Sequence, residues 1–279
     1  MIVFPNSKIN LGLHVIRKRP AGYHDLETVF YPLPLTDALE IVPLGSHEYT
    51  SSFPFTLSGA VVKGRITSNL CVRAYKLLKK DFPTLPKVKI HLHKSIPSGA
   101  GLGGGSADAA FALSLLNRMF GLAIPINKLL NYAEELGSDC PFFIINKPCF
   151  ATGKGEILEE LPLDLSSFYI IIVNPGIHID TGIAFLSIKP AVPRQSIREV
   201  ICRPPAEWKH ELINDFENSV FIRFPEIEKI KKQLYASGAV YASMSGSGST
   251  VFGIFPKATK PDLNFPATYF VRSLPGYLG

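Results

Sequence analysis

The stretch "IPSGAGLGGGSADAA", from Ile96 to Ala110, places five glycines between Gly99 and Gly105 and then continues into an alanine-rich run. The preceding "VKIHLH" alternates as a strand does, and the following "ADAAFALSLLNRMF" is typical of a helix. A glycine loop at such a junction presents several backbone N–H groups beside the positive end of the helix dipole. We therefore expect a phosphate site here, because a Cβ atom would hold the phosphate away from the backbone.

Known glycine loops narrow the kind of phosphate site. A P-loop ends in Gly-Lys-Ser/Thr, whereas this loop ends at Gly105–Ser106 without a lysine. The segment from Gly99 to Gly104 matches the dinucleotide fingerprint, but no carboxylate occurs between Asp108 and Glu134, where the ribose partner should stand. The protein-kinase motifs are missing as well. A nucleoside triphosphate site of another family remains, with a plain flexible loop as the alternative.

The composition favours a globular cytoplasmic protein. The chain has 279 residues, 46% of them hydrophobic, which suits about two domains or one large one. Its start, "MIVFPNSK", has no export pattern, and the four cysteines show no C-x-x-C spacing, so we expect reduced thiols and no membrane attachment. The net charge of +6 suits a phosphorylated or nucleotide substrate, and because the basic residues are scattered we expect no nucleic acid partner.

The segment "SKINLGLHV" predicts a strand near the start of the chain. Apolar residues from Ile9 to Val15 alternate with polar residues or glycine, which is the period of a half-buried strand. We therefore expect Lys8 and Asn10 to share the face opposite the core.

Strands and helices alternate along the rest of the chain, which predicts two α+β lobes. We expect strands at 38–42, 55–59, 88–93, 149–152 and 168–173, a strand pair around 245–249, and helices beginning near 69, 107, 126, 181, 216 and 226. Pro125 and Gly137 bound one of these helices. The segment "LPLDLSS" resembles a domain joint, which gives lobes 1–160 and 161–279, and residues 189–205 are irregular enough to form a mobile surface loop.

The glycine stretch resembles the second motif of the GHMP kinases, small-molecule kinases named for galactose, homoserine, mevalonate and phosphomevalonate. The resemblance extends to "SKINLGL", "GYHDLETVF", "LGSDCPFF" and "MSGSGSTVFGIF", which occur in the order that the family has. It implies an N-terminal lobe similar to ribosomal protein S5 domain 2 and a C-terminal ferredoxin-like lobe.

The resemblance also implies the reaction, which is transfer of phosphate from ATP, with Mg²⁺, to a hydroxyl of a small-molecule cytidine diphosphate substrate in isoprenoid precursor synthesis. Two alternatives stay open. One is a GHMP kinase for mevalonate, homoserine or a sugar, and the other is a non-catalytic nucleotide- or RNA-binding module. The oligomeric state and the protein ligands of the metal are not predicted.

Phosphoryl transfer to an alcohol needs a positioned base and cationic stabilisation. Asp139 is the candidate base, because it follows a helix stop at Gly137 and resembles the aspartate of the family's "G-S/A-D-x-P". An ordinary helix cap is the alternative role. Lys8 resembles the lysine of the family's "AKLNL" and would orient the hydroxyl and Asp139, with a solvated lysine as the alternative.

The ATP site is expected to include the glycine loop and the residues on either side of it. The assigned residues are Asn69, Pro97, Ser98, Gly99, Ala100, Gly101, Leu102, Gly103, Gly104, Gly105, Ser106 and Ala107. Ser106 is a candidate ligand of Mg²⁺ or phosphate, and capping the helix is its alternative role.

The acceptor site is expected to read a cytosine base. Tyr23 offers an aromatic face, His24 a hydrogen-bonding ring, and Phe185 would close the other face of the base. Asn10 and Thr181 are expected nearby. The second glycine loop would close over the phosphate or the acceptor with Ser245, Gly246, Ser247 and Gly248, and a plain hairpin turn is the alternative.

Overall fold

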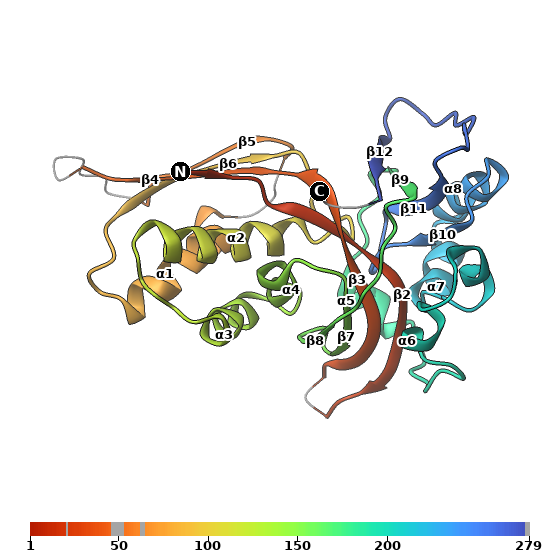
Figure 1. Ribbon diagram of the computed structural model, residues 1–279, viewed down its shortest axis with the longest axis horizontal. Coiled ribbons are helices and arrows are strands. Elements are labelled where there is room, and N and C mark those ends of the chain that lie inside the picture. The colour runs from red at the N-terminus through yellow and green to blue at the C-terminus, as the bar shows by residue number, and fades with distance from the viewer. Residues whose placement is uncertain (21, 46–52, 62–64, 277–279) are drawn as a thin grey trace. The chain divides into compact units, whose positions relative to one another are not determined.

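The computed structural model describes residues 1–20, 22–45, 53–61 and 65–276 (Figure 1). Two compact units are present. Unit 1 comprises Met1–Ser7, Leu35–Ser98 and Gly103–Asn146, and unit 2 comprises Lys8–Pro34, Gly99–Leu102 and the residues from Lys147 onward. The part of the chain that the structure describes contains no helix long and apolar enough to span a membrane.

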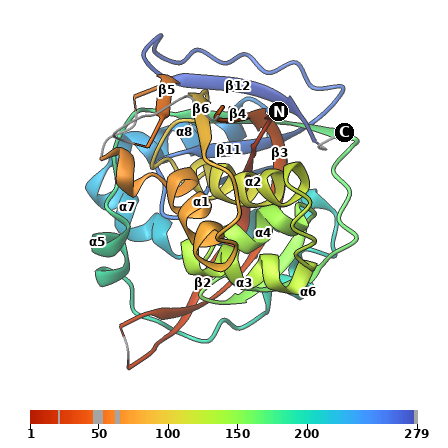
Figure 2. The same ribbon diagram turned by 90° about the vertical axis from the view of Figure 1, so that its left-hand side faces the viewer.

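Unit 1 is a sheet with helices on one face, as Figures 1 and 2 show. Its strands run in the order β1-β4-β6-β5, with β5 parallel to β6 and the other pairs antiparallel. The strands are β1 (Ile2–Val3), β4 (Ala38–Pro43), β5 (Phe55–Gly59) and β6 (Val88–Lys94), and the helices are η1 (Ile66–Ser68), α1 (Leu70–Asp81), α2 (Gly104–Met119), α3 (Ile126–Leu136) and α4 (Cys140–Ile145).

The core of unit 1 follows from two periodicities. Val88, Ile90 and Leu92 alternate along β6 with more exposed residues, so one face of the sheet is buried. The alanines of α2, including Ala109 and Ala112, are fully buried, and their small side chains let α1 and the other helices approach closely.

Two further sheets, with strand orders β2-β3-β7-β8 and β10-β11-β9-β12, belong to unit 2 except for two residues at the start of β2 and two at the end of β3, which belong to unit 1. Their strands are β2 (Asn6–Lys18), β3 (His24–Thr36), β7 (Cys149–Gly153), β8 (Ile157–Glu160), β9 (Phe168–Asn174), β10 (Tyr241–Met244), β11 (Val251–Pro256) and β12 (Phe270–Pro275). The helices are α5 (Thr181–Leu186), α6 (Ile197–Val200), η2 (Pro205–His210), α7 (Phe216–Arg223) and α8 (Pro225–Ala236). The apolar face of α8, with Ile227, Ile230 and Leu234, is buried in one core with residues of β9, β10 and β11.

The predicted α+β class is confirmed, and so are the helices and strands expected from local patterns. The expectation of a half-buried strand at 7–15 is wrong, because residues 6 to 15 of β2 are buried on both faces. Residues 189–205 are not wholly irregular, since α6 buries Ile197 and Val200. Strands β3 and β12 were not predicted. The family lobes 1–160 and 161–279 stay a prediction, and the compact units divide the chain differently.

Candidate active site

The first half of the glycine loop, Gly99–Leu102, packs against the second glycine loop within unit 2. A Cβ atom at Gly101, where φ is +80°, would lie 2.0 Å from the carbonyl oxygen of Ser245. The Ser245 hydroxyl donates to the Gly101 carbonyl at 2.8 Å, and the Thr250 N–H donates to the Ala100 carbonyl at 3.2 Å. Position 101 therefore requires glycine, because the backbones of the two glycine loops are in contact there.

The second half of the loop begins α2 in unit 1. Gly103 occupies the N-cap position with φ +71° and offers no side-chain cap. The first turn of a helix leaves N–H groups without intrahelical partners, and here that turn consists of Gly104, Gly105 and Ser106. These are the donors that an anion requires. Ser106 lies inside the helix, so it does not have the capping role that was its alternative.

A buried ion cluster, which the sequence reasoning missed, adjoins this half of the loop. Lys94 Nζ donates to Asp37 and, at 2.7 Å, to Asp108. Asp37 Oδ1 also accepts from the N–H groups of Ser95, at 2.6 Å, and Ile96, at 2.9 Å, so it fixes the chain that enters the loop. Burial raises the pKa of Asp108 to about 7, and its Oδ1 has no hydrogen-bond partner. A charged residue inside the alanine-rich helix was the one sequence signal of this cluster.

Asp139 and Asn69 differ in what their side chains do in unit 1. Asp139 stands at the N-cap position of α4, but its side chain makes no capping hydrogen bond. The alternative of a plain helix cap is therefore not realised. Asn69 does cap α1, accepting from the Cys71 N–H at 2.9 Å. Asn69 thus has a structural role, and its ATP contact stays a prediction.

Lys8 and Asn10 are buried, 3% and 2% exposed, although they were expected on the face opposite the core, and the alternative of a solvated Lys8 is not realised. Burial is tolerated because the polar atoms are paired. Lys8 Nζ donates to Asn10 Oδ1 at 2.6 Å and lies 4.9 Å from the centre of the Phe30 ring. Asn10 Nδ2 donates to Thr28 Oγ1 at 3.0 Å. The ammonium group is thereby held in one direction. Lys8 belongs to unit 2 and Asp139 to unit 1, so their pairing stays a prediction.

Of the expected cytosine readers, His24 and Phe185 lie together. Their rings stack with centroids 4.7 Å apart and planes 13° from parallel. Burial, and then the charge of Lys18, lower the pKa of His24, which favours the neutral ring that both donates and accepts. Tyr23 is 62% exposed, and Lys154 Nζ lies 5.5 Å from the centre of its ring.

Thr181 and Asn10 both contact the second glycine loop. The Thr181 hydroxyl shares a hydrogen bond of 2.9 Å with the Ser247 hydroxyl. The Asn10 N–H donates to the Ser245 hydroxyl at 3.2 Å. Unit 2 therefore brings together Ser245–Gly248, Gly99–Leu102, Asn10 and Thr181, as a shared site requires.

Known proteins match nearly the whole chain. The profile of the GHMP kinases N terminal domain matches residues 69–147, and that of the GHMP kinases C terminal matches residues 197–263. The chain is 53% identical over 270 residues to the 4-diphosphocytidyl-2-C-methyl-D-erythritol kinase of Bacteroides fragilis, which is 96% of this chain and 97% of that protein. It is 52% identical over 271 residues to the protein of that name from Bacteroides thetaiotaomicron, which is 97% of this chain and 98% of that protein.

A solved structure agrees with these relatives. A crystal structure of 4-(cytidine 5'-diphospho)-2C-methyl-D-erythritol kinase superposes with a TM-score of 0.77 at 31% identity, over 91% of this chain and 90% of that chain. Similarity of this extent shows that the chain belongs to the GHMP kinases, in the family of the 4-diphosphocytidyl-2-C-methyl-D-erythritol kinases.

Proposed function

We propose that this chain transfers the γ-phosphoryl group of ATP to the 2-hydroxyl of 4-diphosphocytidyl-2-C-methyl-D-erythritol, a step of isoprenoid precursor synthesis by the non-mevalonate route. The observation that carries the proposal is 53% identity, over 96% of the chain, to a kinase of that name. The glycine loop supports it, because its donors suit the phosphates that the reaction must hold.

The ATP phosphates would bind to the first turn of α2 and to the loop that enters it. Among the described residues no group of three or more His, Cys, Asp or Glu side chains is arranged to hold a metal ion. Mg²⁺ usually keeps several waters and binds to substrate phosphates with few protein ligands, so we propose that the ion arrives with ATP and is held mainly by phosphate oxygens and waters. The Ser106 hydroxyl, in the first turn of α2, is the protein ligand that we propose. The ion supplies charge neutralisation to the phosphates when bound.

Asp139 would accept a proton in the reaction, and Lys8 would supply a positive charge. Asp139 is our candidate to accept the proton of the 2-hydroxyl, because it follows the helix stop at Gly137 and matches the aspartate of the family's "G-S/A-D-x-P". Lys8 would orient the hydroxyl and the transferred phosphate, because the Asn10 side chain fixes its ammonium group.

The acceptor would bind within unit 2. Tyr23 and Phe185 would stack on the cytosine, and His24 would read its edge with a neutral ring. Asn10, Thr181 and the loop Ser245–Gly248 would hold the polar part of the acceptor, which the hydrogen bonds between them support.

We place the reaction in the cytoplasm. Cys71, Cys140 and Cys149 are buried free thiols and Cys202 is an exposed one, which suits a reducing compartment. Both proposed substrates are small and strongly anionic, and the net charge of +6 favours their approach.

A panel of acceptors tests the function. ATP consumption would be measured with the cytidine compound, mevalonate, homoserine and galactose, each at the same concentration. We expect turnover with the cytidine compound alone. Turnover with another alcohol would assign the chain to a different GHMP activity, and no turnover with any of them would favour a binding role.

A further inference from the structure

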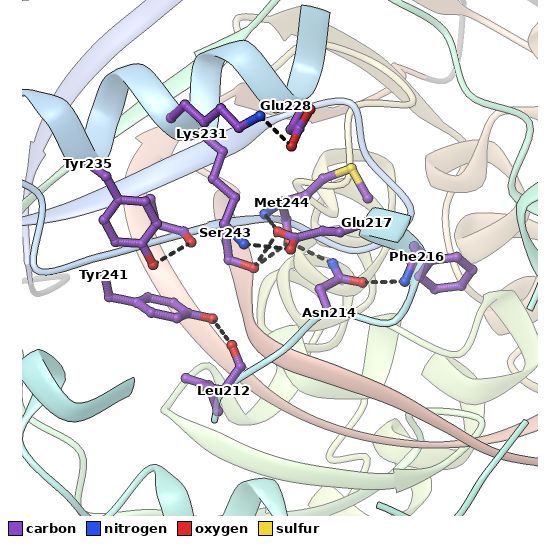
Figure 3. Close-up of polar contacts among 12 residues, drawn as sticks. Leu212, Asn214, Phe216, Glu217, Glu228, Lys231, Tyr235, Tyr241, Ser243 and Met244 are labelled. Carbon is purple, nitrogen blue, oxygen red and sulfur yellow. Dashed lines mark hydrogen bonds and ion pairs between the residues drawn. The ribbon is translucent and has the colours of Figure 1, made fainter. Parts of the chain in front are cut away.

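A buried amide fixes the second glycine loop in place. Asn214 precedes α7 and is 1% exposed. Its Nδ2 group donates to the carbonyls of Met244, at 2.7 Å, and Gly246, at 2.8 Å. Its Oδ1 atom accepts from the Phe216 N–H at 3.0 Å (Figure 3). All three of these bonds are to backbone groups, and two of them hold the start of the loop.

Glu217 binds the backbone N–H group of Met244, the residue whose carbonyl group accepts from Asn214. Glu217 Oε1 accepts from the Met244 N–H at 2.8 Å and from the Ser243 hydroxyl at 3.0 Å, as Figure 3 shows. Lys231 Nζ donates to Oε2 at 2.6 Å and balances the buried charge. Both the N–H and the carbonyl of the last residue of β10 are therefore bound by side chains.

The segment around Asn214 is anchored to β2. The Leu13 N–H donates to the Ile213 carbonyl, and the Asp215 N–H donates to the Leu13 carbonyl, both at 2.9 Å. Asp215 Oδ2 also accepts from the Val15 N–H at 2.8 Å. Strand β2 is the strand that carries Asn10, so Asn214 ties the second glycine loop to a strand of the candidate site.

A shift of the second loop would be transmitted to the first. The Ser245 hydroxyl bonds to the Gly101 carbonyl and to the Asn10 N–H. The backbones at Gly101 and Ser245 are so close that no Cβ atom fits between them. Because there is no free space between these two backbones, a displacement of the residues next to Ser245 must either move Gly101 or break these hydrogen bonds.

We propose that Asn214, supported by Glu217, is a positioning residue for phosphoryl transfer. It touches neither substrate, and it sets where Ser245–Gly248 stands against Gly101 and Asn10. The inference rests on the proposed function, because turnover is its readout. Misplacing a positioning element by about 1 Å can cost roughly 100-fold in rate, so its effect should appear in kcat.

Asn214→Asp is the sharpest test. The substitution keeps the size of the side chain and the oxygen that accepts from Phe216, and it puts a second oxygen opposite the carbonyls of Met244 and Gly246. Tyr235→Phe is the matched control, because it removes a hydrogen bond from α8 to the Ala242 carbonyl of β10, at 3.2 Å, without touching the loop. Asn214→Ala removes the donations without adding charge and replaces Asn214→Asp if that variant does not fold.

The measurements are kcat, the KM values for ATP and the cytidine acceptor, the thermal midpoint, and amide exchange of the peptide covering residues 244–250. We expect the Asn214 variant to lose roughly 10- to 100-fold in kcat, with faster exchange of that peptide, while Tyr235→Phe loses stability only. Wild-type kcat in the folded Asn214 variant, or equal losses in the two variants, would overturn the inference. An inactive wild-type enzyme would instead overturn the proposed function.

Discussion

The imidazole ring of His24 lies against the phenyl ring of Phe185, with centroids 4.7 Å apart. A base cannot enter between these two rings unless they separate. Phe185 also meets the Phe216 ring edge-on, with centroids 4.9 Å apart. His24 thus covers one face of Phe185 in this structure, and a base could stack on that face only after the two rings had moved apart.

Removing an aromatic face should weaken acceptor binding. Stacking on a base contributes roughly 1 to 3 kcal/mol, so Tyr23→Ala or Phe185→Ala should raise the KM for the acceptor about 5- to 150-fold. The KM for ATP should stay unchanged. Ile222→Ala, at a site 84% exposed on α7, serves as the control. A change confined to the KM for ATP would contradict the assignment of these rings.

Gly105→Ala should separate folding from ATP binding. Gly105 lies in α2, and the nearest atom to an added Cβ is Leu70 Cδ1 at 4.0 Å, so the fold has room for the methyl group. Alanine favours a helix over glycine by roughly 1 kcal/mol, so the thermal midpoint should hold or rise. ATP affinity should nevertheless fall at least about tenfold, because the methyl group would stand at the phosphate.

Ser114→Ala on the exposed side of the same helix is the matched control for Gly105→Ala. It should leave ATP affinity unchanged. Calorimetric titration with a non-hydrolysable ATP analogue measures both variants. Equal affinity in Gly105→Ala and wild type would show that the phosphates do not approach this turn.

Asp139→Asn should abolish turnover without unfolding the protein. Asparagine keeps the size of the side chain and an oxygen that accepts hydrogen bonds, so the thermal midpoint should change little. Loss of the base should lower kcat by roughly 100-fold or more, with the KM for ATP little altered. Steady-state kinetics measure kcat and the KM for ATP, and a melting curve measures the thermal midpoint. Normal turnover would remove Asp139 from the mechanism.

The Asp108→Asn variant should gain stability relative to the wild type as the pH rises. The folded-state pKa of Asp108 is about 7 against an ordinary value of 3.8, so the folded protein binds a proton that the unfolded chain releases between these values. The contribution of wild-type Asp108 to stability therefore falls as pH rises through this range, and asparagine has no such dependence.

The measurement is the difference in thermal midpoint between Asp108→Asn and wild type, recorded from pH 5 to pH 8. Over this range, the thermal midpoint of Asp108→Asn should rise by a few degrees relative to that of the wild type. Asp164→Asn is the control, because Asp164 is exposed and hydrogen bonds from Ser166 lower its pKa. A flat difference for Asp108→Asn would show that Asp108 is ionised throughout.

Local signals made much of the fold predictable. Pro125 and Gly137 bound α3 where the sequence indicated, and the alanine-rich run after the glycine loop forms α2. Strand β3 was missed because its middle is buried on both faces and shows no alternation. The burial of Lys8 was not predictable, because it depends on contacts with Asn10 and Phe30 that only the folded chain creates.

The supports of the site escaped prediction for the same reason. Lys94 meets Asp37 across 57 residues of sequence, and Asn214 meets Met244 across 30. No local pattern marks such pairs. The glycines could be found from sequence because a loop that approaches a phosphate or another backbone needs them at the positions themselves.

Phosphorylation of the cytidine acceptor by the wild-type protein tests the central claim most directly. Transfer of labelled γ-phosphate from ATP would be followed with the cytidine diphosphate acceptor and with its uridine counterpart, and the product would be located by phosphorus NMR. We predict a new phosphate monoester on the 2-hydroxyl and a kcat/KM at least about tenfold higher for the cytidine form. Equal use of both acceptors, or a phosphate on another hydroxyl, would contradict the account.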